Sequence, residues 1–210
     1  MKTFEKLLLE NKIWAQCMIE EDPSYFVKLS NLQTPEFLWI GCSDSRVPAN
    51  QITGTEPGEI FVHRNIANLV VNTDVNMLSV LEYAVEILKV KHVIVVGHYG
   101  CGGIKAAMSR QHYGIINHWL KNIKDVYRFH RKEIDSLPTE EQRMDRLTEL
   151  NVKEQVFNLS KTSIVQKAWK YEKRPHLHGW VYGLKDGLIR PVFDLEPGTH
   201  IDNLYEYDNI

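Results

Sequence analysis

Cysteine is scarce in this chain, which has only Cys17, Cys42 and Cys101 among its 210 residues. So small and odd a number excludes a disulfide framework and favours metal binding or catalysis for Cys42 and Cys101. Cys17 lies in an early helical pattern and has no ligand-type neighbour at a comparable spacing. We therefore expect Cys17 to be a packing residue that behaves as a small hydrophobe.

Long apolar runs and an excess of one charge are also absent. No stretch approaches the roughly 18 uncharged apolar residues that a membrane-spanning helix requires. Charged residues interrupt the apolar run at 7–9, which argues against a signal peptide. The formal net charge of -2 provides no basic field for nucleic acid or a membrane surface. We expect a cytoplasmic protein that binds neither and that acts on a small or neutral partner.

The chain also lacks internal repeats, low-complexity segments and linkers rich in Pro, Gly and Ser. Residues 1–210 are therefore expected to form a single domain with its own core. About the first 35 residues are expected to form a helical arm, and residues 191–210 a short acidic tail. Within the arm, Asp22 and Pro23 predict a helix start, and Thr34-Pro35 predicts its end.

Strand and helix patterns alternate through the rest of the chain. Short apolar runs predict buried strands, and two of these runs end at Gly41 and Gly97. The predicted strands are 37–40, 59–63, 92–96 and 176–182, and the predicted helices begin at 73 or 74 and at 102 and cover roughly 114–133 and 150–169. This alternation predicts an α/β fold with a mostly parallel central β-sheet flanked by helices. Turn residues at 185–187 predict a closing hairpin.

Two short motifs directly follow predicted strands. They are Gly-Cys-Ser-Asp-Ser-Arg at 41–46 and His-Tyr-Gly-Cys-Gly-Gly at 98–103. Open α/β sheets place functional sites outside the carboxyl ends of their strands, so the two motifs are expected to converge. Together they offer thiolates, an imidazole and a carboxylate, which are ligands that Zn²⁺ accepts in tetrahedral geometry.

Three other interpretations of these motifs were weighed. Gly41-x-Ser43-x-Ser45 resembles the nucleophile elbow of serine hydrolases, but serine replaces its second glycine. The glycine-rich run at 97–103 suits a phosphate, yet its spacing matches neither the dinucleotide fingerprint nor the P-loop. A zinc ion with four protein ligands would be purely structural. An open fourth position distinguishes a catalytic site from a structural one.

The motifs 42–46 and 98–103, together with His-Arg-Asn at 63–65, resemble the β-class carbonic anhydrases. The resemblance runs from about Trp14 to Arg190. It implies an α/β enzyme that hydrates CO₂ reversibly to bicarbonate and a proton by zinc-bound hydroxide, with one Zn²⁺ per subunit. It also implies a homodimer, with pairs of dimers forming a tetramer. By this resemblance the zinc ligands are Cys42, His98 and Cys101, and the catalytic pair is Asp44 and Arg46.

The spacing of Asp44 and Arg46 permits a guanidinium-carboxylate pair. While the pair holds, Asp44 can accept a hydrogen bond from bound water; once it breaks, Asp44 can become the fourth metal ligand and stop catalysis. Two thiolates weaken zinc as a Lewis acid, so we expect activity to need mildly alkaline pH. The alternative is an ordinary ion pair at a strand end, which contributes little when exposed.

The resemblance further implies a substrate pocket around Gln33, Tyr83 and the backbone N–H of Gly102. The alternatives are a core role for Tyr83 and no role for Gln33. A subset of the family, typified by bacterial enzymes, also carries a noncatalytic bicarbonate pocket that favours the inactive, aspartate-bound metal. The matching residues are Trp39, Arg64 and Tyr182, which supply an indole N–H, a fixed cation and a phenolic O–H. The alternative for this trio is two core aromatics and a structural ion pair.

One function of another class remains open, a noncatalytic zinc-stabilised oligomer that senses bicarbonate. Asp44 and Arg46 favour the enzyme, because a structural metal site has little use for a carboxylate beside a release partner. The chain departs from longer relatives after Arg190, which puts any C-terminal assembly contact in doubt. The amphipathic stretch 4–18 resembles helices that pack on a neighbouring subunit, so we expect dimerisation without the tail.

Overall fold

The computed structural model describes residues 2–31 and 33–210. It falls into two compact units, one ending at Thr34 and the other running from Pro35 to Ile210. Each unit is described by itself. The organisation of all 210 residues as one domain remains a prediction.

The first unit contains helices α1 (Thr3–Glu21) and α2 (Tyr25–Leu29). The predicted helix start at Asp22 is wrong, because Asp22 ends α1 and its Oδ1 accepts a hydrogen bond from the backbone N–H of Ser24 at 2.9 Å. An aspartate that bonds to backbone two residues ahead favours a turn over a helix. The next helix therefore starts later and ends earlier than the pattern predicts.

The apolar side chains of α1 are largely exposed within this unit. Trp14 makes edge-to-face contacts with Tyr25 and Phe26, with ring centroids 6.4 and 5.6 Å apart. None of the described residues of α1 is buried. Cys17 is exposed, so its prediction as a packing residue is wrong for the single chain. Helical periodicity identified an apolar stripe, but it could not tell what covers that stripe.

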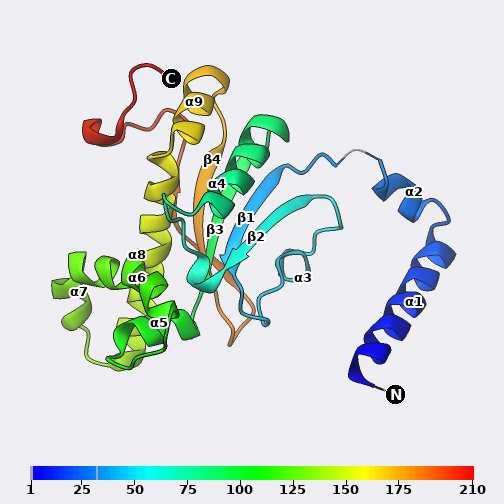
Figure 1. Cartoon of the computed structure of the whole chain (residues 1–210), viewed down its shortest axis with the longest axis horizontal. Coiled ribbons are helices and arrows are strands. Elements are labelled where there is room, and N and C mark those ends of the chain that lie inside the picture. Colours follow the sequence, from blue (N-terminus) through cyan, green and yellow to red (C-terminus); the bar gives the residue numbers. More distant parts are fainter. Residues whose placement is uncertain (1, 32) are drawn as a thin grey trace. The chain divides into compact units, whose positions relative to one another are not determined.

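The second unit is built on a five-stranded sheet (Figure 1). Its order is β2-β1-β3-β4-β5, with parallel pairing except between β4 and β5. The strands are β1 (Phe37–Cys42), β2 (Ile60–Asn65), β3 (His92–His98), β4 (His176–Tyr182) and β5 (Ile189–Leu195). This confirms the predicted α/β class with a mostly parallel sheet, and the predicted closing hairpin between β4 and β5.

Helices flank the sheet, and their apolar side chains contribute to two clusters of buried residues. In Figure 1, α8 and α9 run beside the strands, and α5 directly follows β3. The remaining elements are α3 (Ala49–Thr53), η1 (Ile66–Asn68), α4 (Val75–Glu82), η2 (Tyr83–Ile87), α5 (Gly102–Met108), α6 (Ile116–Phe129), α7 (Arg131–Asp135), α8 (Glu140–Ser160), α9 (Ser163–Glu172) and η3 (Asn203–Tyr205).

The predicted helices at 114–133 and 150–169 correspond to α6 with α7 and to α8 with α9. The start of α8 was predicted about ten residues late. Its N-cap, Thr139, accepts a hydrogen bond from the Gln142 backbone N–H while the Gln142 side chain bonds back to the cap. This capping box starts the helix before its apolar face begins.

The sheet has two different faces. One is covered by the cluster that includes Leu38, Val93 and Val95 together with residues of α8. The other carries Trp39, Ile94 and Val96, with Trp180 and Tyr182 partly buried against them. Alternation of side chains along each strand produces this division.

Gly41 lies where the indole of Trp39 leaves no room for a side chain. A Cβ atom at position 41 would be 2.2 Å from Trp39 Nε1, and the Trp39 side chain is fully buried. Overpacking of this kind typically costs about 1–3 kcal/mol. We expect Gly41→Ala to lower the free energy of unfolding by about that amount in urea denaturation. The control is Gly102→Ala, where a Cβ meets nothing within 4 Å; an equal loss in both variants would contradict the packing argument.

Candidate metal centre

The two sequence motifs meet at one end of the parallel sheet. Cys42 is the last residue of β1 and His98 the last of β3, and these strands are neighbours. Because β1 lies between β2 and β3, the chain leaves this part of the sheet in two directions, and such a switch in strand order is where functional sites of open α/β sheets usually lie. Cys101 caps the start of α5, three residues after His98.

Three potential metal ligands come together at this place. Cys42 Sγ and Cys101 Sγ are 3.9 Å apart, and a ligand atom of His98 lies within 4.8 Å of both sulfurs. All three residues are buried. Two sulfurs each about 2.3 Å from a tetrahedral zinc ion lie about 3.8 Å apart. The observed sulfur separation matches that value.

The imidazole of His98 presents the right nitrogen to this cluster. Its Nδ1 donates a hydrogen bond to the Tyr99 backbone oxygen at 3.1 Å, which leaves the lone pair on Nε2. His98 Nε2 is buried and has no hydrogen-bond partner among the described residues. A buried polar atom without a partner is costly, and a bound cation satisfies it. The residues therefore fit a zinc ion.

Asp44 lies beside the cluster and is held by Arg46. Arg46 Nε and Nη2 donate to the two carboxylate oxygens at 2.9 and 2.7 Å, and the Arg46 backbone N–H donates at 3.0 Å. Asp44 Oδ2 also lies 3.7 Å from His98 Nε2. The Arg46 guanidinium keeps the pKa of Asp44 well below its usual range, so this carboxylate is ionised at neutral pH.

The two buried cysteines share a proton unequally. The hydrogen bond from the Cys101 thiol lowers the pKa of Cys42, and contact with His98 lowers it further against the opposing effect of burial. The same hydrogen bond, together with burial, raises the pKa of Cys101. The contact between the two sulfurs thus favours a thiolate on one of them, and the thiolate is the form that binds metals.

Trp39 and Arg64 lie on the neighbouring strands β1 and β2, whereas Tyr182 lies on β4, with β3 between β4 and β1. Arg64 pairs with Gly41 in register, and its guanidinium donates to the backbone oxygens of Cys42 at 2.8 Å and Asp44 at 2.5 Å. Trp39 Nε1 is buried without a hydrogen-bond partner among the described residues. Tyr182 packs against the cluster that contains Trp39.

The residues predicted to line the substrate pocket do not all lie at the metal centre. Gly102 begins α5 next to Cys101 and is exposed. Tyr83 is 44% exposed, and its ring lies 5.8 Å from that of Phe61, which pairs with Leu38 near the start of β1. The structure thus places Tyr83 towards the opposite end of the sheet from Cys42. Gln33 belongs to the first unit and is exposed there.

Sequence reasoning missed the backbone contribution of η1 to this centre. Ala67 adopts a left-handed conformation with φ of 63°, and its backbone N–H contributes to lowering the pKa of Cys42. Ala67 also packs against Gly103, where a Cβ would be 3.1 Å from the Ala67 side chain. Glycine is the usual signal for left-handed backbone, so an alanine gave no warning.

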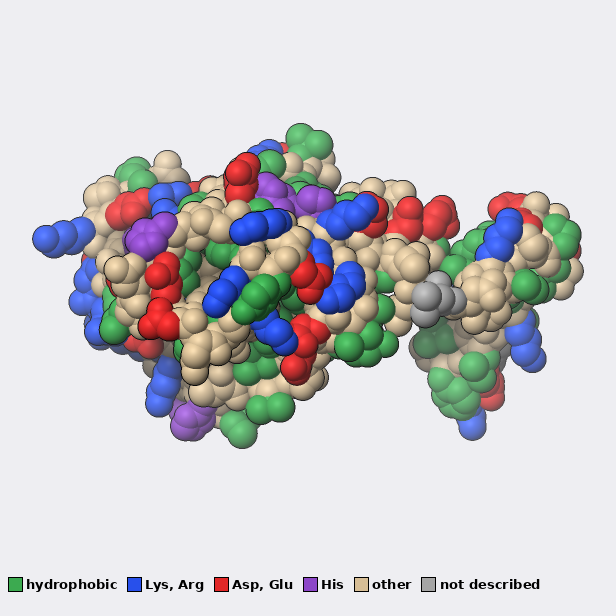
Figure 2. All heavy atoms as spheres, turned by 90° about the horizontal axis from the view of Figure 1, so that it is seen from above, with side chains coloured by type: hydrophobic (Ala, Val, Ile, Leu, Met, Phe, Trp, Pro, Cys, Tyr) green, Lys and Arg blue, Asp and Glu red, His purple; other side chains and the backbone are tan. Residues whose placement is uncertain are grey.

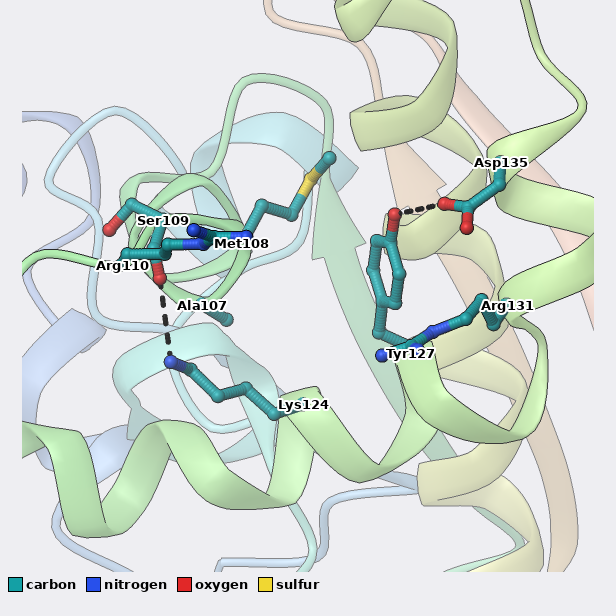
Figure 3. Close-up of a pocket in the computed structure, with 8 residues that line it drawn as sticks. All are labelled: Ala107, Met108, Ser109, Arg110, Lys124, Tyr127, Arg131 and Asp135. Atoms are coloured by element: carbon teal, nitrogen blue, oxygen red, sulfur yellow. Dashed lines mark hydrogen bonds between the residues drawn. The ribbon is translucent and has the colours of Figure 1, made fainter.

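A cavity of about 450 Å³ lies elsewhere, between the end of α5 and helices α6 and α7 (Figure 3). Its lining includes Arg110, Lys124 and Arg131 but none of the sequence-predicted site residues. Two hydrogen bonds join polar groups of this lining: Lys124 donates to the Ser109 backbone oxygen, and the Tyr127 hydroxyl donates to Asp135. The metal centre and this cavity therefore have no residue in common.

Comparisons with known proteins agree with this geometry. Residues 37–189 match the family described as carbonic anhydrase. A carbonic anhydrase of Emericella nidulans is 48% identical over 201 residues, covering 96% of this chain and 88% of that protein. Tetrameric β-carbonic anhydrases from Sordaria macrospora superpose with a TM-score of 0.88 at 39% identity, covering 92% of this chain and 98% of that one. The β-carbonic anhydrase of Coccomyxa, solved with acetazolamide, has a TM-score of 0.88 at 38% identity, covering 93% and 89%.

The fold and these matches define an enzyme of the carbonic anhydrase class. The chain belongs to the β-class carbonic anhydrase family. The relatives named above that share most of its length are two fungal proteins and one from Coccomyxa, and the bacterial subset with a bicarbonate pocket remains a prediction. Among residues 2–31 and 33–210, no helix is both long and apolar enough to span a bilayer.

Proposed function

We propose that this chain catalyses the reversible hydration of CO₂ to bicarbonate and a proton at a zinc ion held by Cys42, His98 and Cys101. The observation that carries the proposal is the buried cluster of two sulfurs 3.9 Å apart and an unpartnered imidazole nitrogen. A zinc ion held there would lower the pKa of water from about 15.7 towards 7, although less far than in a site of three neutral histidines because two thiolates weaken its Lewis acidity. Membership of the β-class family supports the same reaction.

Asp44 and Arg46 are proposed to control the fourth position of the metal. Arg46 holds both carboxylate oxygens of Asp44, which would leave that position free for water and keep Asp44 placed to accept a hydrogen bond from it. A noncatalytic bicarbonate sensor is not favoured, because the relatives named above are carbonic anhydrases. It also gives no role to a carboxylate poised beside an open position.

The proposed enzyme should become more active as pH rises from about 7 to about 8.5, because two thiolates weaken the Lewis acidity of zinc. Asp44 stays ionised throughout this interval, since Arg46 holds the pKa of Asp44 far below it. The expected rise in activity therefore reflects formation of the nucleophile and not a change in the protonation of Asp44. Stopped-flow CO₂ hydration on zinc-loaded protein at pH 6.5–9 is the test; inert zinc-loaded protein at every pH would sink the proposed function.

The trio of Trp39, Arg64 and Tyr182 is proposed to bind bicarbonate away from the metal and to inhibit the enzyme. Trp39 offers a buried N–H that lacks a partner among the described residues, and Arg64 supplies a cation. Arg64 also holds the backbone oxygens of Cys42 and Asp44. An anion that draws Arg64 away would loosen the loop carrying Asp44, which favours closure of the metal site.

Replacing the donor of Trp39 tests this pocket. We expect Trp39→Phe to need about tenfold more bicarbonate for half inhibition, because one hydrogen bond to an anion is worth about 1.5 kcal/mol. The readout is the ratio of hydration rates with and without bicarbonate, so a change in the uninhibited rate does not affect it. Trp180→Phe, on the same face of the sheet, is the matched control. Unchanged inhibition in Trp39→Phe would refute the pocket.

Gln33, Tyr83 and the backbone N–H of Gly102 are proposed to line the substrate pocket. Since Tyr83 lies beside Phe61 and far along the sheet from Cys42, its side chain can serve the pocket only from a second copy of the chain. An oligomer is consistent with the tetrameric proteins of Sordaria macrospora. A homodimer, and a tetramer built from two dimers, are accordingly proposed.

A further inference from the structure

Three histidines gather at the end of the sheet where the parallel strands begin. His92 opens β3 and pairs in register with His176, which opens β4. His178 follows two residues later and therefore faces the same side of the sheet as His176. Figure 2, which looks at the molecule from above, shows a group of histidine side chains at the upper edge of the view and separate histidines at the left and at the bottom. All three residues are half-buried.

The three rings lie close enough to bind one ion. His92 Nδ1 and His178 Nε2 are 3.0 Å apart, and one nitrogen of each ring lies within 4.8 Å of the others. Nitrogens held about 2.1 Å from a tetrahedral zinc ion lie about 3.4 Å apart. Small rotations of the side chains therefore suffice to place all three nitrogens around a single cation.

Neighbouring side chains orient these rings. Phe37 stacks on His92 with ring centroids 5.4 Å apart, and the ring of Trp180 lies 5.9 Å from that of His178. Asp194 on β5 pairs with His178 in register, and its Oδ2 is 3.2 Å from His176 Nε2. A carboxylate on the second nitrogen of a histidine is a common outer partner of metal ligands, and it adds the negative charge that a cation site needs.

Hydrogen bonds among the three histidine rings do not fully explain why the rings lie together. Three adjacent imidazoles repel one another when protonated, and a neutral ring can donate only one hydrogen bond. Burial, followed by the neighbouring His176 and His92, lowers the pKa of His178 to about 4, so this ring is neutral at pH 7. Neutral imidazole is the form that binds metals.

We propose that His92, His176 and His178 form a second metal site, one that binds a transition-metal cation of the Zn²⁺ class through imidazole nitrogen. The site is independent of the proposed catalytic metal. His92 and His98 are the first and last residues of the same strand, about 20 Å apart at about 3.3 Å per residue. A cation here would tie β3 to β4, and through Asp194 to β5.

The test counts zinc ions and identifies their ligands on tag-free protein. Equilibrium dialysis against Zn²⁺ should give two equivalents per chain for the wild type and one for the double variant His92→Ala/His178→Ala. X-ray absorption at the zinc edge should show that the equivalent lost in the double variant has nitrogen and oxygen neighbours and no sulfur. Cys42→Ser should instead lose the sulfur-bound equivalent and keep the nitrogen-bound one.

Two further variants make the result decisive. His176→Gln, which changes a single ring at the start of β4, should weaken the second equivalent at least tenfold even where the double variant folds poorly. His200→Ala, at an exposed histidine paired with Glu206, is the control and should keep both equivalents. A wild type that binds one zinc, or a second zinc that persists in His176→Gln and in the double variant, would overturn the proposal.

Discussion

Cys42→Ser is expected to lower kcat/KM for CO₂ hydration by at least about 1,000-fold and to release the sulfur-bound metal. Water without a metal keeps a pKa of about 15.7, so almost none of the nucleophile exists at neutral pH. Cys42 is also one of the two buried sulfurs that lie 3.9 Å apart in the cluster. The measurements are stopped-flow hydration and zinc content on the same preparation.

Cys17→Ser is the matched control for this loss. Cys17 is exposed on α1, in the other unit of the chain, so its replacement should leave kcat/KM and the sulfur-bound zinc unchanged. Circular dichroism of Cys42→Ser should retain the helical signal, since one buried oxygen replaces one sulfur of similar shape. Full activity in Cys42→Ser would remove the proposed metal site as the seat of catalysis.

Arg46→Ala is expected to reduce kcat/KM by about 100-fold while zinc remains bound. The substitution removes two side-chain hydrogen bonds that hold the Asp44 carboxylate away from the metal position. Asp44 Oδ2 is already only 3.7 Å from His98 Nε2, so a released carboxylate reaches the fourth position with a small rotation. The measurements are hydration rate and zinc content across pH 6.5–9.

A second substitution separates this switch from simple loss of charge. Arg46→Ala combined with Asp44→Asn removes the anion that closes the site, so water should replace the carboxylate at the fourth position and part of the hydration activity lost in Arg46→Ala should return. Arg110→Ala is the control, because Arg110 lines the cavity near α6 and, among the described residues, makes no hydrogen bond with Asp44. Wild-type rates in Arg46→Ala would show that Arg46 has no part in holding the site open.

The convergence of Cys42, His98 and Cys101 could be predicted because it follows from topology. Apolar runs identified the strands, and the carboxyl ends of neighbouring parallel strands necessarily lie side by side. The spacing of Asp44 and Arg46 similarly limited their geometry to a local pair. The convergence of the ligands and the local pair can both be predicted from short sequence patterns, together with the rule that the carboxyl ends of neighbouring parallel strands lie side by side.

The histidine cluster could not be predicted in this way. His92 and His176 lie 84 residues apart in sequence, and only the register of β3 against β4 brings them together. A shift of one residue in that register would place the side chains on opposite faces. The exposure of Cys17 was missed for a related reason, since periodicity defines the apolar face of a helix but not the element that covers it.

The 3.9 Å separation of the two buried sulfurs also has a consequence for oxidation. Sulfur atoms in a disulfide are about 2.0 Å apart, so Cys42 and Cys101 need little movement to react with each other. A zinc ion held as proposed would block that reaction by occupying both thiolates. Its loss would leave the two sulfurs open to oxidation by dissolved oxygen, so the activity of the proposed enzyme in air would depend on how firmly the ion is held.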